Sequence, residues 1–238
     1  MPWKDNYTTS DEIGVRDGAV TWPQGRHMAL GLTVNLNPAA KACGITAEDL
    51  AYPTWHFGVQ EGLEAFLGLF ERLGIKATFA VPALVAEAYG RQVEAILTAG
   101  HEIAAQGLLG EDPNLLDPGQ EADHMDRAGE ILKRATGAAP KGWYALPRGD
   151  DRFATGTVTD ATIGLLRERG YGYFGTGLAD DAPYYWISDF SRRESLLTLP
   201  YYYHFDDTFF LMFPHEGTGL ERPAAFRGLF TPVTSDRG

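Results

Sequence analysis

Hydrophobic residues recur along the chain at two different spacings, and these spacings predict which segments are strands and which are helices. Residues 28–35 form a nearly continuous apolar run that ends at Asn35, which is typical of a strand buried on both faces. Residues 58–73 instead carry apolar side chains three and four positions apart, which predicts a helix with one apolar face. Gly74 follows the last of them and is expected to end that helix.

The same two patterns alternate along the chain to about residue 176. We predict further strands at 75–82, 101–105, 141–147 and 171–176, further helices at 83–98, 118–135 and 159–169, and extended segments at 196–204 and 209–213. Thr159 is a candidate N-cap for the last of these helices. Strands that alternate with helices indicate a mainly parallel sheet with helices outside it. In such folds ligands bind at the carboxyl ends of the strands.

The polar segment 1–27 departs from this pattern. It carries glycines and prolines but also three aromatic side chains, so we expect an irregular arm that lies over the domain. Residues 28–238 are expected to form one domain, because α/β barrels of this length are often single units. From about residue 214 the chain is rich in glycine and proline and shows no obvious last helix.

Charge and composition argue against several kinds of partner. The formal net charge is −12 and the pI is about 4.9, and lysine and arginine form no cluster, which argues against nucleic acid and anionic membrane. No apolar run approaches the roughly 18 residues of a membrane span, and the N-terminus lacks the apolar segment of a secretory signal. A single cysteine, Cys43, argues against a disulfide framework and a cysteine-based zinc site. We therefore expect a soluble, cytoplasmic protein with a small-molecule substrate.

Polar side chains follow two of the predicted strands at the point where each strand ends. Asn35 and Asn37 end the first strand, and Gln106 follows the strand at 101–105, with Gly110 four positions later. Because the carboxyl ends of parallel strands lie at one edge of a sheet, we expect these residues to meet. The set consists of three amides and a glycine. Amides can hydrogen-bond a ligand, but they do not ionise near neutral pH.

Two short motifs resemble the polysaccharide deacetylase superfamily. Residues 74–79 read Gly-Ile-Lys-Ala-Thr-Phe and residues 100–103 read Gly-His-Glu-Ile, in that superfamily's order. Residues 136–143 and 180–186 resemble further blocks, the second of them closer to the intracellular branch with allantoinase-type, cyclic-imide-hydrolysing and peptidoglycan deacetylase-like members. The resemblance extends over roughly residues 20–213. It implies a deformed (β/α) barrel, here shortened at its C-terminus, and hydrolysis of non-peptide C–N bonds.

The resemblance also implies a metal site whose residues are replaced in this chain. The superfamily uses an Asp general base, an Asp ligand and two His ligands three residues apart, a set that suits a divalent metal that activates water. The matching positions hold Asn35 for the base and Asn37 for the Asp ligand. Gln106 and Gly110 stand for the two imidazoles. Amide oxygens are poor substitutes, so we predict no metal and no other cofactor.

Several further residues are candidates for catalysis or binding, each with a structural alternative. Asp181 and Asp207 belong to acidic pairs that either transfer protons or are solvated turn residues. His204 is the best remaining base at neutral pH, although a single histidine is more often structural. The other candidate substrate-binding residues are Trp143, Tyr144, Arg148, Trp186 and Tyr202. Arg148 either clamps a carbonyl or carboxylate or forms a surface ion pair, and the aromatic residues, unless they belong to the core, favour a planar ligand over a hydrated sugar.

Three hypotheses follow for the function. The first is a metal-independent enzyme that hydrolyses an amide or cyclic imide C–N bond, in which a carboxylate or His204 activates water and the amides stabilise the oxyanion. The second is a repurposed pocket that isomerises, cyclises or eliminates a small metabolite. The third is a catalytically silent binding protein. In each case the arm or a homo-oligomer is expected to cover the open edge of the shortened barrel.

Overall fold

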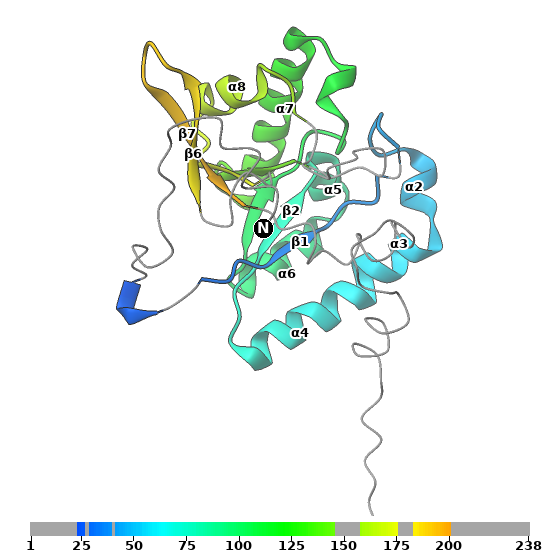
Figure 1. Cartoon of the computed structure of the whole chain (residues 1–238). Coiled ribbons are helices and arrows are strands. Elements are labelled where there is room, and N and C mark those ends of the chain that lie inside the picture. Colours follow the sequence, from blue (N-terminus) through cyan, green and yellow to red (C-terminus); the bar gives the residue numbers. More distant parts are fainter. Residues whose placement is uncertain (1–22, 27–28, 40, 146–157, 176–182, 201–238) are drawn as a thin grey trace, which may run out of the picture. The chain divides into compact units, whose positions relative to one another are not determined.

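The computed structural model describes residues 23–26, 29–39, 41–145, 158–175 and 183–200 (Figure 1). The chain divides into two compact units, residues 1–32 and 33–238. The described residues of the first unit include one short 3₁₀ turn, η2 (Pro23–Gly25). The second unit contains the sheet and the helices that surround it. The predicted boundary between an arm and a domain stays a prediction.

In the described part of the second unit, seven strands form one sheet. They are β1 (Thr33–Asn35), β2 (Thr78–Val81), β3 (Glu102–Ala105), β4 (Gly142–Tyr144), β5 (Tyr173–Gly175), β6 (Tyr184–Asp189) and β7 (Glu194–Leu199). Their order is β1-β2-β3-β4-β5-β7-β6; β6 and β7 are antiparallel and all other neighbours are parallel. The sheet is not closed, because β1 and β6 form its two edges among these strands. The mainly parallel α/β sheet that the alternating pattern predicted is confirmed.

Helices connect the strands of this sheet (Figure 1). They are α2 (Ala47–Ala51), α3 (Pro53–Phe57), the π turn η3 (Gly58–Gly62), α4 (Leu63–Leu73), α5 (Ala83–Ala88), α6 (Gly90–Thr98), the 3₁₀ turn η4 (Pro113–Leu115), α7 (Pro118–Thr136) and α8 (Thr162–Glu168). Helix α7 begins with a capping box at Asp117 and ends at Gly137, whose φ is +81°, close to the predicted bounds. Of the helices that the structure describes, none combines the length and the apolar character needed to cross a membrane.

Two predicted helices are interrupted. The helix predicted at 58–73 begins with the π turn η3, and the one predicted at 83–98 breaks at Tyr89, whose φ of −122° and ψ of 47° are not helical. The Tyr89 hydroxyl accepts a hydrogen bond from Trp55 Nε1 at 2.9 Å, and the two rings pack edge to face. This contact between distant segments fixes Tyr89 where the helix breaks.

Two predicted element boundaries are also wrong. Of the described residues 29–35, only Thr33–Asn35 forms a strand. Helix α8 begins at Thr162, three residues after the predicted N-cap: in the turn before the helix, the Thr159 hydroxyl donates to the buried Glu121 carboxylate at 2.6 Å and accepts the Ala161 N–H at 3.2 Å. The last predicted segment, 209–213, lies outside the described residues.

The register divides the strand residues into two chemically different faces, since side chains alternate along each strand. Phe79 and Ile103 lie on one face, and Phe70 of α4 packs against Phe79 with ring centroids 6.5 Å apart. The other face carries polar and small residues. The aligned row Thr33, Thr78 and Glu102 and the next row Asn35, Ala80 and Ala104 belong to it. This polar face differs from the expected strand that is apolar on both sides.

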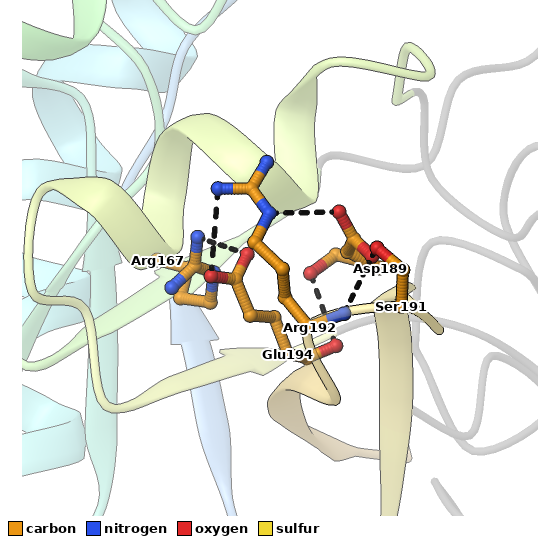
Figure 2. Close-up of polar contacts among 6 residues, drawn as sticks. Arg167, Asp189, Ser191, Arg192 and Glu194 are labelled. Carbon is orange, nitrogen blue, oxygen red and sulfur yellow. Dashed lines mark hydrogen bonds and ion pairs between the residues drawn. The ribbon is translucent and has the colours of Figure 1, made fainter.

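The strands β6 and β7 form a hairpin, of which the sequence analysis missed the first strand. In the turn, the Asp189 carboxylate accepts hydrogen bonds from Ser191 Oγ at 2.6 Å, from Arg192 N at 2.9 Å and from Arg192 Nε at 3.0 Å (Figure 2). These bonds hold the pKa of Asp189 well below its usual range. Arg167 of α8 pairs with Glu194 at 2.5 Å and so joins the hairpin to a helix (Figure 2).

Candidate functional site

Three side-chain amides meet at the carboxyl ends of β1 and β3. Gln106 Nε2 donates to Asn35 Oδ1 at 2.8 Å, and Asn37 Nδ2 donates to Gln106 Oε1 at 3.0 Å. Asn37 Oδ1 in turn accepts the Ala39 N–H at 2.8 Å. Gln106 is buried, whereas Asn35 and Asn37 are half-buried. We call this set the amide chain. The structure thus brings together three residues that the sequence predicted to meet.

The amide chain does not fit the divalent metal that the family pattern implies. Each of its three oxygens already accepts a hydrogen bond, and none carries a charge. Gly110 offers no ligand atom: its φ is +65°, and a Cβ there would lie 2.5 Å from Asn37 Nδ2. Within the part of the chain that the structure describes, no group of three or more His, Cys, Asp or Glu could hold a metal ion. We therefore derive no chemistry through a metal at these residues.

The loop that follows β3 is held by Glu111, to which the sequence analysis gave no role. Its carboxylate accepts the N–H groups of Leu108 and Leu109 at 3.3 and 2.5 Å. It also lies 2.8 Å from Nδ1 of His124, a residue of α7. These three contacts fix the loop that presents Gly110 to Asn37. Nothing in the sequence spacing marks Glu111 and His124 as partners.

Two tyrosines fill the polar face of the sheet next to the amide chain. The Tyr173 ring occupies the space where a Cβ of Gly142 would lie, and the Tyr144 ring occupies the corresponding space at Gly175. The rings pack edge to face with centroids 6.0 Å apart. Burial raises the pKa of both hydroxyls. Tyr144 is only 7% exposed, so its predicted contact with a substrate stays a prediction.

His101 has a structural role at the opposite end of β3. Its Nδ1 accepts the Ala77 N–H at 3.1 Å, and its ring lies 5.5 Å from the Phe70 ring and 5.4 Å from the Phe79 ring. Burial lowers the pKa of His101, and the nearby Lys76 charge lowers it further. A neutral imidazole therefore links β2 to β3 inside the core.

Trp143 lies on the other face of the sheet from Tyr144. Its partner in the register is Ala105, so it lies on the apolar face of the sheet and stacks on Phe174 with ring centroids 5.6 Å apart. It is 6% exposed and lies on the face opposite the amide chain, and its predicted contact with a substrate stays a prediction. Trp186 is 39% exposed and lies on β6, at the other edge of the sheet from β1.

Five predicted site residues lie outside the described residues, and their roles stay predictions. They are Arg148, Asp181, Tyr202, His204 and Asp207.

Comparison with known proteins places the chain in a family. The polysaccharide deacetylase family model matches residues 39–174, more than half of the chain. The peptidoglycan deacetylase of Helicobacter pylori is 31% identical over 130 residues, which is 54% of this chain and 42% of that protein. A peptidoglycan deacetylase-like protein of Gibberella zeae is 30% identical over 139 residues, 57% of this chain and 38% of that protein. The chain thus spans less than half the length of these curated relatives.

Solved structures show the same fold. A Mycobacterium smegmatis crystal structure, provisionally named a polysaccharide deacetylase, has a TM-score of 0.68 at 27% identity and covers 84% of this chain and 68% of that chain. The Puue allantoinase has a TM-score of 0.61 at 24% identity and covers 79% of this chain and 67% of that chain, a likeness of fold alone. The match of the family model over residues 39–174 shows that the chain belongs to the polysaccharide deacetylase family, whose members are carbohydrate esterases or amidohydrolases that act on C–N bonds.

Proposed function

We propose that this protein is a metal-independent member of the family that acts on a small molecule, by hydrolysis of an amide or cyclic imide C–N bond. The observation that carries the proposal is the amide chain, whose residues stand, by the resemblance in sequence, where the family has its base and metal ligands. Amides recognise carbonyl and N–H groups without any charge. A planar imide presents carbonyl and N–H groups along one edge, so the side-chain amides can form hydrogen bonds with both groups.

Asn37 is the member of the amide chain that we assign to the ligand. It is half-buried, and its Nδ2 donates one of its two N–H groups to Gln106. Gln106 is buried, and its side-chain oxygen and nitrogen both form hydrogen bonds to other members of the amide chain. Gln106 therefore positions Asn37 and Asn35. A preorganised amide donor aimed at a developing oxyanion contributes about 3–4 kcal/mol to catalysis.

Hydrolysis also needs a base, because an amide cannot take a proton from water. We assign this step to His204, with Asp207 or Asp181 as the alternative carboxylate base. The base takes a proton from water, the oxygen attacks the carbonyl carbon, and the same proton passes to the departing nitrogen. Asn37 would stabilise the negative charge on the carbonyl oxygen meanwhile.

A non-hydrolytic function is the second candidate, either a repurposed isomerase or cyclase or a silent binding protein. The satisfied hydrogen bonds favour it, since all three amide oxygens already have donors inside the protein. Amides that are hydrogen-bonded in this way can shape a pocket and bind a ligand without transferring a proton.

The two candidates are separated by measuring turnover and binding on the same protein. Protein treated with EDTA is incubated with a cyclic imide, with allantoin and with a linear N-acetyl amide, and ring opening or acetate release is followed by chromatography. Turnover that persists in EDTA and is lost in Asn37→Ala and His204→Ala, but not in the exposed control Asn114→Ala, supports the hydrolase. Turnover only after zinc is added contradicts the proposal. A thermal shift with the same compounds and no turnover supports the second candidate.

A further inference from the structure

Helix α4 carries an exposed apolar stripe in addition to its buried face. Leu63 and Phe70 are buried, each at 5% exposure, whereas Phe66, Leu69 and Leu73 are 47%, 38% and 61% exposed. The exposed residues are three and four positions apart, so they lie together along one flank of the helix. A surface helix normally has polar residues there, and an exposed apolar stripe of this kind marks an interaction surface.

The same flank is shallow in its first half. Gly62 lies four positions before Phe66, and Ala65 lies between them. A Cβ at Gly62 would meet only the Phe57 carbonyl oxygen, at 3.7 Å, and one at Gly58 would meet nothing within 4 Å. The first half of this flank therefore carries no large side chain, whereas the second half carries the three exposed apolar side chains of the stripe.

We propose that this stripe is the contact between two copies of the chain, with the two α4 helices packed antiparallel about a two-fold axis. In that arrangement the projecting half of each helix lies on the shallow half of the other, so that Leu69 packs on the Gly62 of the second copy. Glycine lets two helices approach closely, and ridges that fit into grooves are the usual basis of helix packing. The proposal concerns self-association and is independent of the proposed catalytic function.

Charges along one edge of the stripe favour a second copy over another occupant. Glu61 and Arg72 are both exposed and lie eleven positions apart, three turns along the same edge. Arg72 Nη1 lies 3.7 Å from a Cβ built at Gly68, so its guanidinium folds back along that edge. Of the ion pairs between described residues, none includes either residue. The antiparallel arrangement places each Arg72 within one helical turn of the Glu61 of the other copy, and the two-fold axis makes this pair twice.

The contact surface extends beyond α4. A stable dimer buries roughly 1,000 Å² or more in total, which is more than a stripe of three large side chains supplies. Phe57 and Tyr52 are 59% and 61% exposed and precede the shallow half, towards the position that Leu73 of the second copy would take. These side chains add the apolar area that the dimer requires.

Sedimentation velocity of the full chain over a wide range of concentration tests the proposal. The wild type is expected to be a dimer that dissociates on dilution. Gly62→Leu fills the shallow half and improves helix propensity, so it is expected to yield a stable monomer. Gly129→Leu is the matched control, because Gly129 lies in α7 and a Cβ there would meet nothing within 4 Å; it is expected to leave the dimer intact.

A charge swap tests the orientation of the two helices. Glu61→Arg and Arg72→Glu each place like charges opposite one another twice, and each is expected to weaken the dimer about tenfold, equal to about 1.4 kcal/mol. The double variant restores opposite charges and is expected to restore the dimer. A wild type that is monomeric at every concentration overturns the proposal. A dimer that survives Gly62→Leu also overturns it.

Discussion

Replacing Gly110 by alanine tests whether the amide chain requires glycine at this position. The φ of +65° costs an L-residue about 1 kcal/mol. The added Cβ would lie 2.5 Å from Asn37 Nδ2 and 3.1 Å from Asn37 Cγ, so the Asn37 side chain has to turn away. The buried Gln106 carbonyl then loses its donor, which costs about 1–3 kcal/mol. We expect the free energy of unfolding to fall by about 2–4 kcal/mol in total.

Gly74 provides a matched control for this substitution. Its φ is also +65°, but a Cβ there would meet nothing within 4 Å, so Gly74→Ala is expected to cost only about 1 kcal/mol. In an Asn37→Ala background, Gly110→Ala should likewise cost only about 1 kcal/mol, because the crowded side chain is gone. Urea denaturation followed by tryptophan fluorescence measures all four variants. Equal losses for Gly110→Ala and Gly74→Ala in the wild-type background would refute the reasoning.

Three further substitutions test other parts of the structure in the same urea assay. Burial, and then Lys76, lowers the pKa of folded His101, so the unfolded chain binds the proton more readily and stability should fall as pH drops below 6.5. His101→Asn, which keeps an acceptor in place of Nδ1, should flatten this dependence; an unchanged slope would contradict it. Thr162→Val removes a donor to the buried Glu121 carboxylate and should cost about 1–3 kcal/mol; a negligible cost would count against that bond. Arg193→Gly should raise stability by up to about 1 kcal/mol, because φ there is +55°, and a loss would contradict this.

The sequence predicted the parallel strands and most helix ends, but it did not predict the edge strand β6 or the helix break at Tyr89. Buried parallel strands read as short apolar runs, and glycines such as Gly74 and Gly137 end helices through their positive φ. The strand β6 was missed because its aromatic residues are exposed at an edge and pair with β7 alone, so they resembled a loop lining a ligand site. The break at Tyr89 depends on a hydrogen bond from Trp55, 34 positions away, for which no local signal exists.

The sequence predicted which amide residues meet at the candidate site but not the hydrogen bonds between them. Asn35 and Asn37 are two residues apart and therefore share a face, and β1 and β3 both flank β2, so a meeting with Gln106 could be predicted. The sequence could not show that these amides bond to one another, because that depends on register and rotamers. One signal was available: Thr33, Asn35 and Asn37 alternate with apolar residues, which marks a polar face.

The two tyrosines of β4 and β5 make positions on neighbouring strands depend on each other. Tyr173 occupies the space at Gly142, and Tyr144 occupies the space at Gly175. A side chain at either glycine would require its tyrosine to become smaller at the same time. During divergence each pair should therefore change together, so these four positions are inherited as two linked units.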